Sequence, residues 1–135
     1  MNFHLGTKNV RLQNGHYLIA SISVDGNWED ATLDLDLYIG NNNGTLSWGG
    51  SNFSQRATEI RIGKDARGGW CPILKATLLD SQGVARISGL YLGHCIGVWK
   101  STLICDTSKA HLAVPVENTQ GGYLYFEPNY LGAAF

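Results

Sequence analysis

The strongest constraint on the fold of this chain is that its sequence repeats itself. The stretch NFHLGTKNVRL (2–12) matches NFSQRATEIRI (52–62) at a constant offset of 50. Next, YLIASISVDG (17–26) matches ILKATLLDSQG (73–83), where GKDARGGWCP lengthens the intervening loop by six residues. This pattern indicates a tandem duplication of one unit. Two copies are too few for an open solenoid, so we expect the halves to complete each other's core.

The repeated unit has the pattern of β-strands. Apolar residues alternate with polar ones at 10–12, 33–37 and 60–62, and again at 74–78. Turn residues separate these runs, and the 17 Gly against 3 Pro indicate turns that rely on positive φ. Period two at this spacing predicts an all-β fold. DLDLYIG (34–40) is the one stretch compatible with a single helical turn, so Asp34 and Asp36 are expected on a solvated strand face or at a helix cap.

The third part of the repeat can be aligned in two registers. Without a gap, residues 92–105 lie under residues 35–48. Alternatively, residues 105–126 lie under residues 28–48 with one extra residue in the turn, which places Asn118 under Asn41 and restores the Asn-x-x-Gly turn. We favour the second register for that reason, and it makes 85–104 an insertion. Accordingly, we expect one domain over 1–128, with repeat one at about 2–48, repeat two at about 52–128, and a tail at 129–135.

Composition narrows the class of partner and the compartment. The 135 residues suit one compact domain, and ten basic against eleven acidic residues without a basic run predict neither a nucleic-acid nor a membrane partner. The N-terminus has no signal-peptide pattern. The chain has three cysteines, Cys71, Cys95 and Cys105, and their spacing is not that of zinc ligands. An odd number without a secretion signal argues against a disulfide framework, so we expect buried or half-buried free thiols and a cytoplasmic location.

The chemistry of the chain is concentrated in DLYIGNNNGTLSWGGSNFS (36–54). Amide and hydroxyl side chains both donate and accept hydrogen bonds, as recognition of a neutral, hydroxyl-rich ligand requires. An alternative explanation of the Asn run is purely structural: Asn and Gly are found in tight turns because they tolerate positive φ. Trp48 and Phe53 are expected in the core rather than as platforms for stacking. Leu18, Ile22 and Leu78 are expected beside them.

The stretch IGNNNGTLSWGGSNFS (39–54), together with the duplication, closely resembles the inter-repeat signature of the cyanovirin-N homologue lectins. The resemblance implies two pseudo-symmetric halves, each a three-stranded antiparallel sheet plus a β-hairpin. It also implies binding of mannose-rich oligosaccharides, typically α1-2-linked mannose, without metal, cofactor or catalysis. Secreted members carry two disulfides at positions that fall here on Thr7 with Ile22 and on Ala57 with Leu78. Their replacement is similar to the fungal, intracellular branch of the family.

The resemblance also implies two sugar sites. The primary site would use residues from the Asn turn, the hinge between the repeats and a hairpin tip: Asn41, Asn43, Ser51, Asn52, Gln55, Asp80, Ser81 and Gln82. The secondary site would use residues from repeat one and the end of the chain: Asn2, Thr7, Ser23, Asp25, Asn118 and Gln120. Family members often have an acidic residue where Gly40 and Asn43 stand.

Other functions remain as alternatives. The strongest is a protein-interaction or structural β domain that has lost sugar binding. An enzyme is not expected, because Ser51 and Ser54 lack a nucleophile motif and nothing marks Asp34 and Asp36 as a desolvated carboxylate pair. Four scattered histidines predict no metal site. The partners are therefore expected to be mannose-rich glycans or glycoproteins, bound by a monomer that can form a swapped dimer through the Gly-rich segment 49–52.

Overall fold

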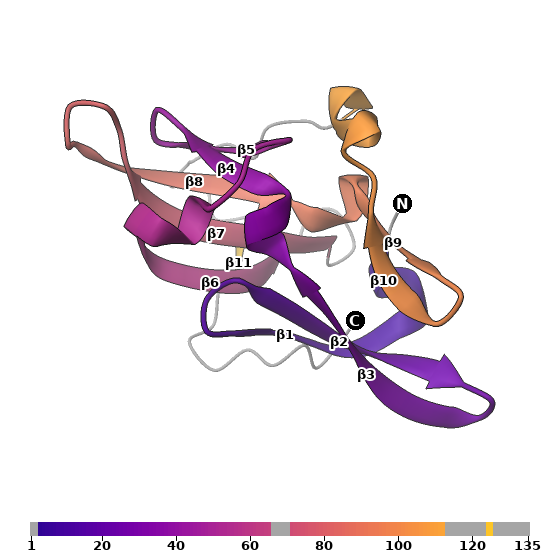
Figure 1. The fold of residues 1–135 in the computed structure, drawn as a ribbon. Helices are drawn as coiled ribbons and strands as arrows, with labels where there is room; N and C mark the ends of the chain where they lie inside the picture. The colour runs from indigo at the N-terminus through magenta and orange to yellow at the C-terminus, as the bar shows by residue number, and fades with distance from the viewer. Residues whose placement is uncertain (1–2, 66–70, 113–123, 126–135) are drawn as a thin grey trace.

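A computed structural model describes residues 3–65, 71–112 and 124–125 of the chain. The described residues form antiparallel β-sheets joined by short 3₁₀ turns (Figure 1). The first half contains η1 (Phe3–Gly6), β1 (Thr7–Gln13), β2 (Tyr17–Val24), β3 (Asn27–Asp34), η2 (Leu35–Leu37), β4 (Ile39–Asn42) and β5 (Thr45–Trp48). The second half contains η3 (Phe53–Arg56), β6 (Ala57–Asp65), β7 (Cys71–Leu79), β8 (Ala85–Tyr91), η4 (Leu92–His94), β9 (Ile96–Trp99), β10 (Thr102–Cys105) and η5 (Thr107–Leu112). A short β11 (Leu124–Tyr125) pairs with β6.

The two halves have the same order of elements, in agreement with the predicted duplication. Each half has a three-stranded meander, a 3₁₀ turn and a two-stranded hairpin. The backbone closes identically after each hairpin, since Gly49 N–H donates to Tyr38 C=O and Asp106 N–H donates to Cys95 C=O, both at 2.8 Å. The predicted all-β fold class is therefore confirmed.

Our preferred register for the third part of the repeat was wrong. Residues 85–104 are not an insertion: they form β8, η4, β9 and most of β10, as the gapless alignment requires. The error came from treating the Asn-Gly pair as the mark of the turn. Lys100 and Ser101 adopt φ of 50° and 63° at the positions where Asn43 and Gly44 adopt 51° and 89°. The pairing of β9 with β10 imposes this turn on residues without its usual sequence signature.

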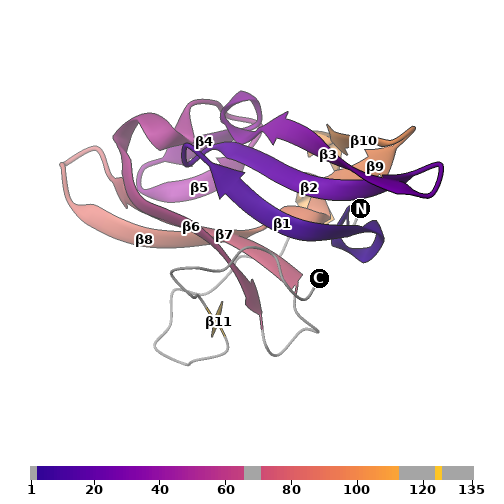
Figure 2. The ribbon, with the colours of Figure 1, turned by 90° about the horizontal axis from the view of Figure 1, so that it is seen from below.

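The halves exchange their hairpins. The β4–β5 hairpin of the first half packs on β8 of the second, and β9–β10 of the second half packs on β3 of the first (Figures 1 and 2). The buried hydroxyl of Ser88 on β8 accepts a hydrogen bond from Leu46 N–H at 3.0 Å, which fixes the first of these contacts. This exchange confirms that each half completes the other.

One hydrophobic cluster runs through both halves. It includes Leu18 and Phe53, both fully buried, and Trp48 packs against it partly buried, so the predicted core positions are confirmed. The positions of the implied disulfides are direct cross-strand partners, because Thr7 pairs with Ile22 and Ala57 pairs with Leu78. Apolar packing replaces a covalent link there: Ile22 and Leu78 are both buried.

Two of the cysteines have described side chains. Cys95 is buried and Cys105 is half-buried, and both are free thiols, as expected. Burial, followed by the nearby Cys95 thiol, raises the pKa of Cys105 to about 12, so this thiol is a poor nucleophile near neutral pH. Cys71 lies at the start of β7.

None of the helical turns in the described part of the chain has the length and apolar character needed to cross a membrane.

Candidate functional site

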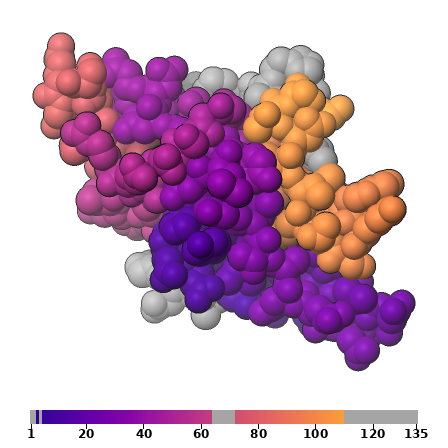
Figure 3. All heavy atoms as spheres, viewed as in Figure 1, coloured from indigo at the N-terminus to yellow at the C-terminus, as the bar shows by residue number. Residues whose placement is uncertain are grey.

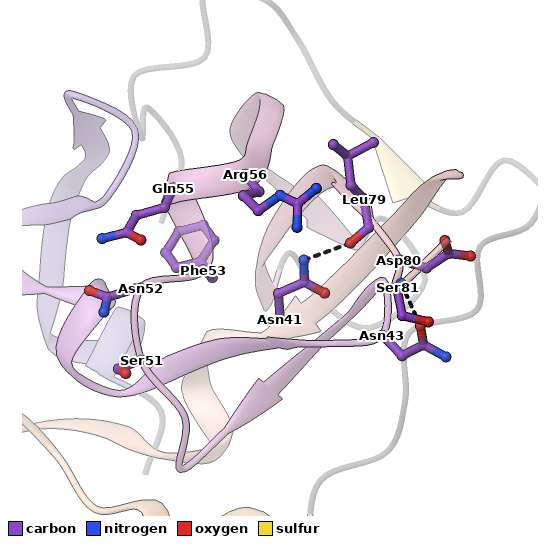
Figure 4. A pocket seen from close by; sticks show the side chains of 10 residues that line it. All are labelled: Asn41, Asn43, Ser51, Asn52, Phe53, Gln55, Arg56, Leu79, Asp80 and Ser81. Carbon is purple, nitrogen blue, oxygen red and sulfur yellow. Dashed lines mark hydrogen bonds between the residues drawn. The ribbon is translucent and has the colours of Figure 1, made fainter. Parts of the chain in front are cut away.

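A polar pocket of about 430 Å³ lies where three segments meet at one end of the molecule (Figure 4). The segments are the tip of the β4–β5 hairpin, the hinge leading into η3, and the turn between β7 and β8. The lining residues are Asn41, Asn43, Ser51, Asn52, Phe53, Gln55, Arg56, Leu79, Asp80 and Ser81. The hairpin belongs to the first half, and η3 and the β7–β8 turn belong to the second, so the hairpin exchange assembles the pocket.

Asn41 and Asn43 fasten the hairpin tip to the β7–β8 turn. The Asn41 amide donates to Leu79 C=O at 2.9 Å, and its oxygen accepts from Gly44 N–H at 2.7 Å. The oxygen of Asn43 accepts from Ser81 N–H at 2.9 Å. The bonds to Leu79 and from Ser81 make the two asparagines a brace between the repeats, and the bond from Gly44 shapes the hairpin turn. Each side chain keeps further hydrogen-bonding capacity.

Asp80 holds the β7–β8 turn in shape. Its side chain is only 5% exposed, and its carboxylate accepts from Gln82 N–H, Val84 N–H and Arg86 Nε at 2.8–2.9 Å. The hydrogen bond from Arg86, followed by that from Val84, holds the pKa of Asp80 below its usual value of 3.8. Asp80 is therefore ionised and internally paired near neutral pH, and its role in the pocket is to position the turn.

The hinge side of the pocket is fixed through Asp36. Its carbonyl accepts from Asn52 N–H at 2.8 Å, and its carboxylate accepts from both the backbone N–H and the hydroxyl of Ser54. Asn52 itself adopts a left-handed conformation, with φ of 60°, as the residue that precedes η3. Asn tolerates this conformation better than most residues, which suits it to the sharp entry into η3.

Four polar side chains remain exposed around this braced frame: Ser51, Asn52, Gln55 and Ser81. Within the described residues, none of these four side chains makes a hydrogen bond. Figure 4 places Ser51, Asn52 and Gln55 on the hinge side and Ser81 on the turn side. Together they offer amide and hydroxyl groups that can each donate and accept.

The structure brings together most of the predicted primary site. Seven of its eight predicted residues line the pocket, and Gln82 does not; its backbone serves Asp80 instead. Phe53, Arg56 and Leu79 line the pocket without having been predicted there. Each of the three is adjacent in sequence to a predicted site residue: Phe53 follows Asn52, Arg56 follows Gln55, and Leu79 precedes Asp80. That adjacency was the signal that could have placed them at the pocket.

Only three of the six residues of the predicted secondary site lie within the described part of the chain, so the site stays a prediction. Asn2, Asn118 and Gln120 lie outside the described residues. Ser23 is exposed near the end of β2, Asp25 is exposed in the β2–β3 turn, and Thr7 is 5% exposed. Because β9–β10 is the hairpin that packs on the first half, its residues occupy the positions matching the Asn turn. Val98 and Lys100 stand there in place of Asn41 and Asn43, and Leu5 stands in place of Gln55. The amide chemistry of the pocket is therefore not repeated at these positions.

Asp34 and Asp36 lie beside His16 and form a structural cluster. Asp34 caps η2 by accepting from Asp36 N–H, which agrees with the predicted helix cap. The His16 ring nitrogen lies 2.7 Å from Asp34 and 3.5 Å from Asp36. The three groups are close enough to hold a cation. Their hydrogen bonds to one another and to Ser54 already account for the arrangement, since they join η2 to the β1–β2 turn and to η3.

The fold and site define a class: a duplicated all-β domain with exchanged hairpins and a polar pocket beside the inter-repeat hinge. The model of the CVNH domain family matches residues 3–104, which is more than half of the chain. The chain belongs to this family of cyanovirin-N homologues. A cyanovirin-N homologue of Neurospora crassa is 39% identical over 87 residues, covering 62% of this chain and 78% of that protein.

Solved structures give the same result. The solution structure of the CVNH protein of Gibberella zeae is 38% identical, with a TM-score of 0.70, and covers 77% of this chain and 96% of that one. Microvirin, solved as a complex with mannobiose, has a TM-score of 0.69 at 24% identity, covering 78% of this chain and 98% of that one. At this level of identity, the similarity to microvirin concerns the fold alone.

Proposed function

We propose that this chain is a non-catalytic lectin that binds mannose-rich oligosaccharides, with a preference for α1-2-linked mannose, in the pocket at the inter-repeat hinge. The observation that carries the proposal is the convergence of Ser51, Asn52, Gln55 and Ser81 on a frame braced by Asn41, Asn43 and Asp80. Membership of the family of cyanovirin-N homologues supports it.

The geometry suits a neutral sugar for energetic reasons. Each net hydrogen bond contributes about 0.5–1.5 kcal/mol, so useful affinity needs several at once. Holding the donors on a preformed frame lowers the entropy lost on binding. The volume of about 430 Å³ is enough for a small saccharide. A neutral, hydroxyl-covered ligand matches exposed amides and hydroxyls better than an apolar ligand would.

Catalysis is not part of the proposal. Hydrolysis of a glycosidic bond ordinarily uses two carboxyl groups that flank the bond. Among the residues that line the pocket, Asp80 alone carries a carboxylate, and three hydrogen bonds already hold it. The pocket is built to bind and release its ligand unchanged.

Titration calorimetry with α1-2-linked mannobiose tests the proposal. The double variant Ser51→Ala/Gln55→Ala removes one exposed hydroxyl and one exposed amide without touching the left-handed Asn52, and is expected to weaken binding by about 1–3 kcal/mol, or roughly five- to 150-fold. Asn42→Ala is the control: Asn42 is an exposed amide on β4 that does not line the pocket, so affinity should stay unchanged. Heat indistinguishable from dilution at millimolar sugar would refute the proposal. A non-binding interaction domain would give that result for every variant.

A further inference from the structure

The charges around the pocket do not balance. Arg56 is exposed on η3, lines the pocket, and forms no ion pair with any described residue. Asp80 supplies the single carboxylate of the lining, and it is paired with Arg86 at 2.8 Å. The remaining polar lining residues are neutral amides and hydroxyls. One cation is therefore left uncompensated at the edge of a site otherwise suited to neutral groups.

Arg56 stands between two hollows. Figure 4 shows its side chain extending from η3 toward Asn41 and Leu79, over the pocket. A second hollow of about 330 Å³ shares Gln55, Arg56 and Leu79 with the first. Its other lining residues are Ala57, Thr58, Thr77 and Ala85. The guanidinium of Arg56 therefore belongs to the lining of both spaces.

A guanidinium group in such a place favours an anion. Its planar donors match the oxygens of a carboxylate or phosphate and can bind them in pairs, and such charge-assisted bonds are stronger than bonds to a hydroxyl. Among the described residues that line the pocket, only Asp80 carries a carboxylate, and it is 5% exposed and already paired with Arg86. Glu59, on β6, is the next acidic residue along the chain and faces Arg61 at 3.8 Å.

We propose that Arg56 makes this pocket a site for acidic saccharides, that is, for oligosaccharides with a phosphate or carboxylate group beside the sugar that the amides hold. The proposal rests on the proposed function, since it assigns the ligand class of the same pocket. Arg56 is then the residue that determines preference between neutral and anionic sugars.

The test compares α1-2-linked mannobiose with its 6′-phosphate and with the corresponding uronic acid by calorimetry. At low salt we expect at least one of the acidic sugars to bind about five- to tenfold more tightly than the neutral sugar, as expected for one unit charge pair near water. The phosphate and uronate arms distinguish the two kinds of anion. The advantage should shrink at about 0.5 M salt, because screening weakens exposed charge pairs.

The variant Arg56→Gln should bring the ratio of acidic to neutral affinity close to one. Lys100→Gln is the matched control: it removes one positive charge from the β9–β10 hairpin, which lies away from the pocket (Figure 1), and should leave the ratio unchanged. Equal affinity for neutral and acidic sugars would overturn this inference and leave the lectin proposal standing. A preference that survives in Arg56→Gln would also overturn it. Failure of all three sugars to bind would overturn both proposals.

Discussion

Residues forced into left-handed backbone conformations mark corresponding points of the two repeats. β1 has a register shift between Lys8 and Arg11, and β6 has one between Thr58 and Arg61. In the middle of each shift lies a residue with positive φ: Asn9 at 55° and Glu59 at 52°. Asn tolerates this conformation through its short polar side chain, whereas for Glu it is strained. The first repeat has a well-suited residue at this bulge and the second does not.

Glu59→Asn should therefore stabilise the protein. We expect a gain of about 0.5–1 kcal/mol in the free energy of unfolding, since the left-handed conformation costs a typical residue about 1–2 kcal/mol. The lost contact with Arg61 is 3.8 Å long and exposed, so it contributes little. Asn9→Glu is the reciprocal control and should destabilise by a similar amount. Chemical denaturation measures both, and a Glu59→Asn variant no more stable than the parent would contradict this explanation.

Asp80 makes stability depend on pH in one direction. Its pKa in the folded state lies below the ordinary value of 3.8, so the stability it contributes is complete above 3.8 and is lost as pH falls through the lowered pKa. Hydrogen bonds from Ser21 and Arg11 lower the pKa of Asp30 in the same direction. We expect the contribution of these two carboxylates to the melting temperature to be nearly level from pH 7 to 5 and to be lost below pH 4.

The variant Asp80→Asn isolates the contribution of this carboxylate. Because it cannot titrate, its melting temperature should fall less steeply below pH 4 than that of the parent, from a lower starting value at pH 7. Thermal unfolding followed by circular dichroism at several pH values measures both slopes. Identical slopes would show that Asp80 is not the group through which acid acts.

At the scale of elements, the hairpin exchange depends on a close crossing of two backbones. Gly40 at the start of β4 approaches Gly50 in the hinge, and Gly40 also forms an isolated bridge with Asn52. A Cβ added at Gly50 would lie 2.8 Å from the Gly40 Cα, which leaves no room for any side chain. Glycine at position 40 lets the hinge pass close by.

Gly50→Ala should destabilise the protein by about 1–3 kcal/mol, the usual cost of overpacking, because backbone rather than a flexible side chain must move. Gly6→Ala is the control: nothing lies within 4 Å of its added Cβ, so stability should change little. Denaturant titration distinguishes the two. Equal stability of both variants would mean that the crossing is looser than the structure indicates.

The swapped dimer expected from this hinge stays a prediction.

The sequence predicted the fold well where local patterns were strong. It did not predict turns that are imposed by the pairing of strands. Alternation identified the strands, and the duplication identified the halves. The β9–β10 hairpin was missed because Lys100 and Ser101 carry no local signal for a turn with positive φ, and only pairing between strands places them there. For the pocket, residue types identified the amides and hydroxyls. The sequence could not show that Asp80 is buried and hydrogen-bonded within the protein whereas Gln55 is exposed and available to a ligand.

At the scale of the whole molecule, the fold is symmetric and the chemistry is not. Figure 3 shows the β4–β5 and β7–β8 tips at one end, with the β9–β10 hairpin and the β2–β3 turn at the other. The first end carries exposed amides. The second carries Trp99 and Trp28, which are 60% and 49% exposed, each with a lysine above its ring. We therefore expect one saccharide site per chain, and no gain in avidity from a second site on the same monomer.

Chemical-shift mapping of the labelled protein with α1-2-linked mannobiose tests the central claim most directly. We predict saturable shifts for the amides of residues 41–44, 51–56 and 79–82, and none for residues 97–102 in the opposite hairpin. A stoichiometry of one sugar per chain should accompany them. Shifts confined to the β9–β10 hairpin, or a spectrum unchanged at millimolar sugar, would contradict the account.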